Sequence, residues 1–132
     1  MINTKNIDGD SPIRTKTFYG VVGGTLTDDD NVGAIPIVGL DTYGGEVTRV
    51  DFAVGTAPTG ATLNVVIANG GTDIASGSIA ISGRTASDTT IVSGNVDNGT
   101  VLDIDIDQVG SSVAGANLLV AVTVKVHGSI EG

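Results

Sequence analysis

The chain has 132 residues, 20 of them glycine, and its 15 acidic and 6 basic side chains give a formal net charge of −9. This length suits one domain with a buried core, and so negative a charge disfavours nucleic acid as a partner, because phosphates repel it. The absence of cysteine excludes disulfides and thiolate chemistry. No apolar run is long enough to span a membrane or to act as a signal peptide, so we expect no membrane partner.

The first part of the chain is predicted to be an irregular arm, residues 1–13, which precedes a folded domain of residues 14–132. A G-D-S-P run interrupts any regular element in this arm. Three of the six basic residues, Lys5, Arg14 and Lys16, fall within the first 16 positions. This asymmetry suits an arm that reaches an acidic neighbour, such as another copy of the chain. A disordered terminus is an equally good interpretation.

From Arg14 onward, apolar and polar residues alternate with the period of two that is typical of half-buried strands. The first predicted strand is residues 15–22, which two glycines end. Residues 28–31 (D-D-D-N) are predicted to form a polar loop. Residues 34–40 are the next apolar run, and Pro36 within it confines this strand to a sheet edge or an irregular path.

Four further strands are predicted in the middle of the chain. Residues 47–54 alternate clearly, and residues 63–67 follow with the same apolar face. Residues 69–71 (N-G-G) predict a tight hairpin turn, because asparagine and glycine tolerate positive φ. Short strands are then expected around residues 79–81 and at residues 89–93.

Two strong alternations close the sequence. Residues 101–107 read V-L-D-I-D-I-D, and after a glycine-bounded loop at residues 110–115, residues 118–126 place leucine and valine at every second position. Seven or eight short strands without helical periodicity predict an all-β fold. We expect an antiparallel two-sheet β-sandwich, of which the jelly roll is the eight-strand version.

The carboxylates of Asp103, Asp105 and Asp107 raise the question of a metal or catalytic site. Alternate side chains on a strand are about 6.6–6.8 Å apart, whereas calcium draws its oxygen ligands to about 2.3–2.6 Å. The calcium-loop pattern also fails, because Gln108 stands at its glycine position and Ala114 at its twelfth position. A solvated strand face is the favoured interpretation, and a weakly bound shared cation is the alternative.

Other candidate sites lack the partners that chemistry needs. Residues 28–30 form a flexible acidic loop without an identifiable distal ligand, so a solvated turn is favoured over a cation site. His127 is the single histidine, and no G-x-S-x-G motif accompanies it. The glycine run G-V-V-G-G is not followed by the G-K-[ST] of a phosphate-binding loop. We therefore expect no enzyme activity, no catalytic residue, no metal and no cofactor.

Several segments together resemble the β-sandwich proteins of phage virions. Residues 56–71 (T-A-P-T-G-A-T-L-N-V-V-I-A-N-G-G) resemble a segment that precedes and forms a hairpin in such proteins, and residues 99–124, with D-I-D-I-D-Q-V-G, resemble its downstream partner. The early T-K-T-F-Y-G and G-G-T-L-T fit as well. The similarity covers residues 15–126. In that family, the alternating aspartates belong to a strand that is followed by a turn.

The resemblance implies a virion protein of the head surface, tail fibre or baseplate. A module of 132 residues without a shaft repeat or coiled coil suits a capsid decoration (cement) protein, made in the host cytoplasm and located on the outer capsid surface. Such proteins bind the major capsid protein as homodimers or homotrimers and stabilise the shell. The alternative is a tail-fibre or baseplate module that binds host glycans, although four aromatic residues offer few stacking surfaces.

Charge asymmetry and amphipathic side chains select the residues that we expect to contact the capsid or another subunit. These residues are Lys5, Arg14, Lys16, Phe18 and Tyr19. We expect alanine replacements of this set to weaken attachment, and wild-type affinity in such variants would contradict the assignment.

Overall fold

The computed structural model describes residues 14–40 and 43–127, and these residues form strands and no helix. The strands are β2 (Thr15–Thr25), β3 (Asp29–Pro36), β4 (Gly45–Thr56), β5 (Leu63–Asn69), β6 (Thr72–Ile79), β7 (Thr85–Asp88), β8 (Asn95–Val96), β9 (Val101–Gln108) and β10 (Ala116–Val126). Within the described ranges, no helix is long and apolar enough to cross a membrane. The expected arm at residues 1–13 and its Lys5 lie outside the described residues.

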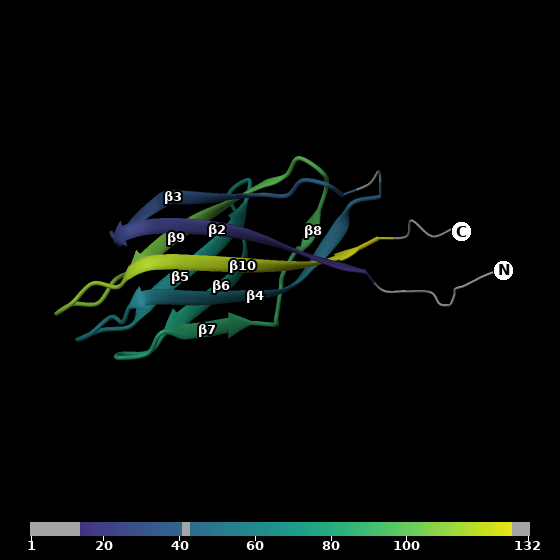
Figure 1. Ribbon diagram of the computed structural model, residues 1–132. Coiled ribbons are helices and arrows are strands. Elements are labelled where there is room, and N and C mark those ends of the chain that lie inside the picture. The colour runs from purple at the N-terminus through teal and green to yellow at the C-terminus, as the bar shows by residue number, and fades with distance from the viewer. Residues whose placement is uncertain (1–13, 41–42, 128–132) are drawn as a thin grey trace.

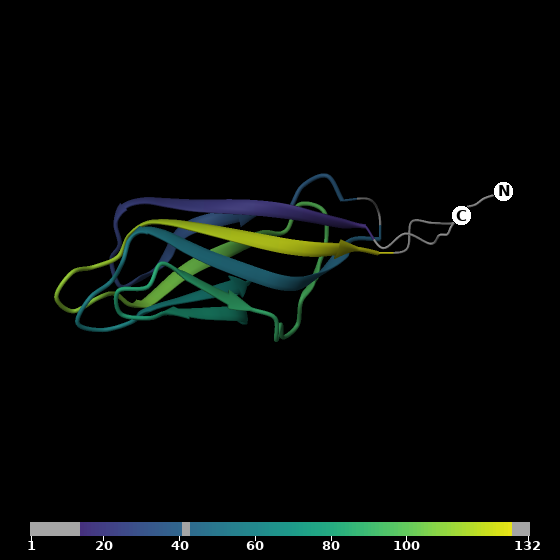
Figure 2. The same ribbon diagram turned by 60° about the horizontal axis from the view of Figure 1, so that its bottom comes forward.

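The strands form two antiparallel sheets that pack face to face (Figures 1 and 2). The first sheet has the order β2-β10-β4-β7, with the short β8 pairing with β4, and the second has the order β3-β9-β5-β6. With the two-residue β8 left aside, successive strands cross between the sheets except at the β5–β6 hairpin, which is the arrangement of an eight-strand jelly roll. The predicted all-β, two-sheet sandwich is therefore confirmed.

The core lies between the sheets and contains the inward-facing residues of every long strand. Leu102, Ile104 and Ile106 of β9 are at most 1% exposed, and the leucine and valines at every second position from Leu118 to Val124 of β10 are fully buried. Phe52 of β4 is the largest buried side chain. Burial of a leucine, isoleucine or phenylalanine contributes about 1.5–3 kcal/mol, so these alternations fix which face of each strand turns inward.

The N-G-G turn forms as predicted, with Gly70 and Gly71 at φ 59° and 89° between β5 and β6. At two other glycines the sheets come unusually close. A Cβ on Gly20 of β2 would lie 3.1 Å from the Ala34 carbonyl oxygen, and one on Gly33 of β3 would lie 2.9 Å from a Val22 methyl. These glycines therefore bring the edge strands β2 and β3 of the two sheets into contact.

Two elements near the start of the domain differ from the expectations. Strand β2 continues through the two glycines to Thr25, and β3 starts at Asp29, within the expected polar loop. Asn31 adopts a φ of 54°, and its backbone N–H donates to the Asp105 carboxylate at 2.8 Å. This contact holds a bulge in β3, so three consecutive polar residues are accommodated in a strand.

Two short strands were placed wrongly. Ile81 lies in a turn after β6, where Ser82 has a φ of 64°, and residues 89–93 are not a strand. Strand β7 instead occupies Thr85–Asp88, and the following segment crosses to the second sheet, where the Val92 N–H donates to the Ile74 carbonyl at 3.0 Å. The apolar residues of the crossing segment caused the error, because they resemble a strand without forming a ladder.

Candidate interaction surfaces

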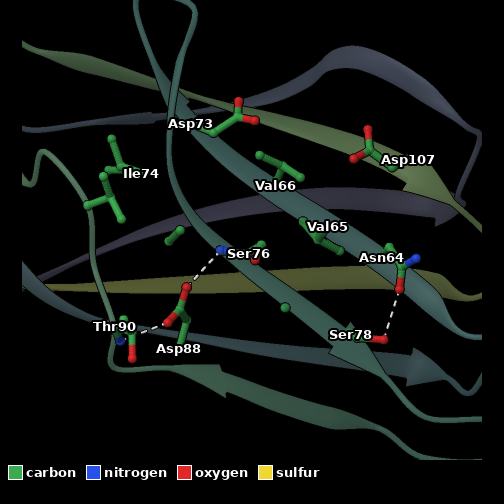
Figure 3. A pocket seen from close by; sticks show the side chains of 13 residues that line it. Asn64, Val65, Val66, Asp73, Ile74, Ser76, Ser78, Asp88, Thr90 and Asp107 are labelled. Carbon is green, nitrogen blue, oxygen red and sulfur yellow. Dashed lines mark hydrogen bonds between the residues drawn. The ribbon is translucent and has the colours of Figure 1, made fainter.

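A cleft of about 620 Å³ lies where the segment after β7 passes β5 and β6 (Figure 3). Asp88 ties this segment to β6, since its carboxylate accepts the Ser76 N–H at 2.9 Å and the Thr90 N–H at 2.8 Å. The Ser78 hydroxyl donates to the Asn64 side-chain oxygen at 2.8 Å. The lining side chains therefore bond to one another and to the backbone.

This cleft does not bring a histidine next to its serines. Its lining contains serines and aspartates but neither a histidine nor an aromatic ring. His127 follows β10, and its N–H donates to the Gly44 carbonyl at 3.0 Å. Among the described residues, no three His, Cys, Asp or Glu side chains form a group that could hold a metal ion.

The aspartate ladder lies on the outer side of the β3-β9-β5-β6 sheet, as the alternation predicted. Asp103 and Asp105 are half-buried and Asp107 is exposed, while their neighbours in β9 face the core. Together with Asp30 and Asp73 they line a shallow hollow of about 440 Å³. We call these five carboxylates the acidic face. No basic residue lines this hollow, so its charges are not neutralised by the described part of the chain.

The crowding of carboxylates affects the protonation of Asp30. The neighbouring charge of Asp105, and after it desolvation and the charge of Asp107, raise the pKa of Asp30 above its ordinary value. The folded state therefore binds this proton more tightly than the unfolded state does. Near neutral pH, where the carboxylates are ionised, their repulsion opposes folding, and this penalty disappears as the pH falls below the ordinary aspartate pKa.

We expect Asp30→Asn to raise the melting temperature slightly at pH 7 and low salt, because the variant removes repulsion at an exposed position. The gain should vanish near pH 2.5, where the carboxyl group is protonated in both states. It should also shrink in 1 M salt, where the Debye length is about 3 Å. Thermal unfolding followed by circular dichroism checks this, and a gain that persists in acid or in high salt would contradict it.

The outer side of the other sheet has a different character. Tyr19 and Val21 of β2 are 59% and 67% exposed, and Leu119 of β10 is 40% exposed. The strand register places Leu119 between Val21 and Ala53 of β4, and it places Ala121 beside Tyr19. These five side chains form a continuous apolar surface, which we call the neutral face.

Charges around the neutral face are balanced in pairs. Asp51 accepts two contacts from Arg49 Nε, at 2.9 and 3.0 Å, and one from the Ser87 hydroxyl at 2.6 Å. The Ser87 bond, and after it Arg49, hold the pKa of Asp51 below its ordinary value. Lys125 of β10 lies opposite Glu46 of β4. The two outer sides of the sandwich therefore differ in both charge and polarity.

The structure places the predicted contact residues in different settings. Tyr19 lies on the neutral face, and Arg14 is exposed at the start of β2. The Lys16 ammonium donates to the Gly39 carbonyl at 2.6 Å. Phe18 points inward and packs, half-buried, against the core, so an alanine at this position would remove core packing as well as any contact.

Sequence reasoning did not select Val21 and Leu119. A signal was present, because F-Y-G-V-V in β2 and L-L-V-A-V in β10 carry apolar residues at both parities. Strands that are apolar on both faces are typical of strands covered on both sides. β2 and β10 are far apart in sequence, so only the strand order shows that their outward-facing apolar residues lie side by side.

Comparisons with known proteins show the fold. Neither a protein-family model nor a curated protein matches the chain. Among solved structures, it is similar to a chain of the cyanophage Pam1 capsid asymmetric unit, with a TM-score of 0.56 and 20% sequence identity. The match covers 96% of this chain and 98% of that chain, so the two share a jelly roll of nearly the same extent.

Proposed function

We propose that the protein is a structural component of a phage virion, a capsid decoration protein that binds the major capsid protein on the outer head surface and stabilises the shell. The observation that carries the proposal is the likeness, over almost the whole of both chains, to a chain of a cyanophage capsid asymmetric unit. The role is non-enzymatic and needs no cofactor. It agrees with the resemblance of residues 15–126 to phage virion proteins.

The two outer faces give the proposed attachment a direction. An apolar surface with balanced charges loses little electrostatic free energy when it is covered by another protein, and apolar burial contributes about 25 cal/mol per Å². The acidic face would lose hydration without gaining partners if it were buried against an acidic or apolar surface. We therefore place the neutral face, with Tyr19, toward the capsid and the acidic face toward solvent.

Cryo-EM of capsids that lack the protein, after mixing with the purified chain, tests this function. We expect ordered density at junctions between capsid subunits, with the β2-β10-β4-β7 sheet turned toward the shell. Many weakly bound copies on one particle would together resist internal pressure. Bare capsids, combined with binding to tails or to host-surface glycans, would overturn the proposal in favour of a receptor-binding module.

A further inference from the structure

The four sheet edges differ in how they are protected against pairing with another chain. Strand β3 carries Pro36 and a bulge, β6 carries a bulge and the exposed Asp73, and β7 has four residues. Such features are the means by which natural proteins block edge pairing. Strand β2 has 11 residues and no proline, and its register with β10 is regular from Thr15 to Val22, before a shift at Gly23 and Gly24.

The backbone of β2 presents its unused hydrogen-bonding groups to solvent. The Arg14 carbonyl accepts the Val126 N–H, in line with the regular pairing of Thr15 to Val22 with β10. The backbone N–H and C=O groups of the even-numbered residues in this stretch therefore point toward β10. Those of the alternate residues point away from β10, and these residues are Thr15, Thr17, Tyr19 and Val21. Within the described residues, no strand pairs with this side.

The charge distribution along β2 suits an antiparallel copy of itself. The 13 residues from Thr15 to Thr27 contain no acidic residue, although the chain carries 15. Arg14 and Lys16 stand at the beginning of the strand, and Asp28 and Asp29 follow its end. When two β2 strands pair antiparallel, Arg14 and Lys16 of each copy therefore approach Asp28 and Asp29 of the other copy. The two-fold symmetry forms this contact at both ends of the pair.

We propose that the chain forms a two-fold symmetric dimer in which β2 pairs antiparallel with β2 of a second copy. A two-fold axis at Gly20 sets Tyr19 of one copy opposite Val21 of the other, an aromatic and a β-branched residue that pair well across strands. Beyond the shift at Gly23 and Gly24, the same direction of pairing brings Arg14 to the end of β2 in the second copy, close to Asp28. The two four-strand ladders become one continuous sheet, and the two neutral faces become one.

Light scattering on the full-length chain after size-exclusion chromatography tests the dimer without any capsid, so its failure is distinguishable from failure of the proposed function. We expect a species of twice the 13.1 kDa chain mass at micromolar concentration. A monomer or a trimer would overturn the proposal, because two-fold edge pairing closes at two copies.

Cysteine pairing tests the register, and the natural chain has no cysteine to interfere. A mixture of the Tyr19→Cys and Val21→Cys chains should give a disulfide-linked heterodimer on mild oxidation, because hydrogen-bonded residues across antiparallel strands have Cα atoms about 5.5 Å apart. Each variant alone should cross-link far less. Equal cross-linking in the separate variants and the mixture would overturn this pairing.

Charge reversal tests the complementary ends. We expect Arg14→Glu or Asp28→Lys alone to raise the dimer dissociation constant by about tenfold, because each creates two repulsive contacts in place of attractive ones. The double variant, in which the signs are exchanged, should restore dimer formation. If the double variant instead loses as much dimer affinity as the two single variants together, the proposed contact between Arg14 and Asp28 is overturned.

Discussion

Replacement of Gly77 by valine is expected to lower the free energy of unfolding by about 3 kcal/mol and the melting temperature by about 10 °C. Gly77 lies in the inward row of β6, opposite Val65, where a Cβ would meet the ring of Phe52 from the other sheet. Phe52 is 1% exposed, so the ring has no free space to enter. A valine therefore forces the sheets apart or the ring out of its rotamer.

The matched control for this substitution is Gly23→Val. Gly23 lies in β2 without a positive φ, and nothing lies within 4 Å of a Cβ built there. A valine in place of a strand glycine should leave stability unchanged or raise it by up to about 1 kcal/mol. Urea unfolding of both variants separates the collision with Phe52 from the general effect of adding a side chain.

A double-mutant cycle identifies the residue that Gly77 accommodates. Gly77→Ala overfills the space and Phe52→Leu leaves part of it empty, so each is destabilising alone. The double variant should lose less than the sum of the two, with a coupling free energy of about 1 kcal/mol. Strict additivity would show that Phe52 is not the side chain displaced by the added methyl group.

The sequence predicted most of the fold because the long strands follow a strict period of two. Residues 50–54 and 118–124 alternate so regularly that burial of one face leaves a single choice of orientation. The short elements escaped prediction, since they depend on contacts distant in sequence. The bulge at Asn31, for example, needs the Asp105 carboxylate from a strand that follows much later.

The candidate surfaces were predictable only in part, for a related reason. The aspartate ladder is contained in one strand, so its outward direction follows from its own sequence. The neutral face combines Val21, Leu119 and Ala53, which three strands bring together through pairing that no local pattern encodes. The sequence likewise showed that charge is distributed unevenly along the chain. The difference in charge and polarity between the two outer faces could be seen only once the strand order was known.

Replacement of Leu119 by aspartate is expected to weaken capsid attachment about thirtyfold, since the loss of a residue that is an interface hot spot costs about 2 kcal/mol and 1.4 kcal/mol corresponds to tenfold. The proposed orientation buries this side chain against the shell, and the variant would place an unpaired carboxylate there. Leu119 belongs to β10, which is not an edge strand, so the change leaves the backbone edge of β2 intact.

The stability of the free protein should change little in this variant, because Leu119 is already 40% exposed. Val92→Asp is the matched control: Val92 is 59% exposed and lines the cleft beside β6, away from the neutral face. Cosedimentation with capsids over a range of protein concentrations measures both affinities, and melting temperatures verify folding. Equal losses in the two variants would assign the effect to added negative charge, and full binding by Leu119→Asp would remove the neutral face from the interface.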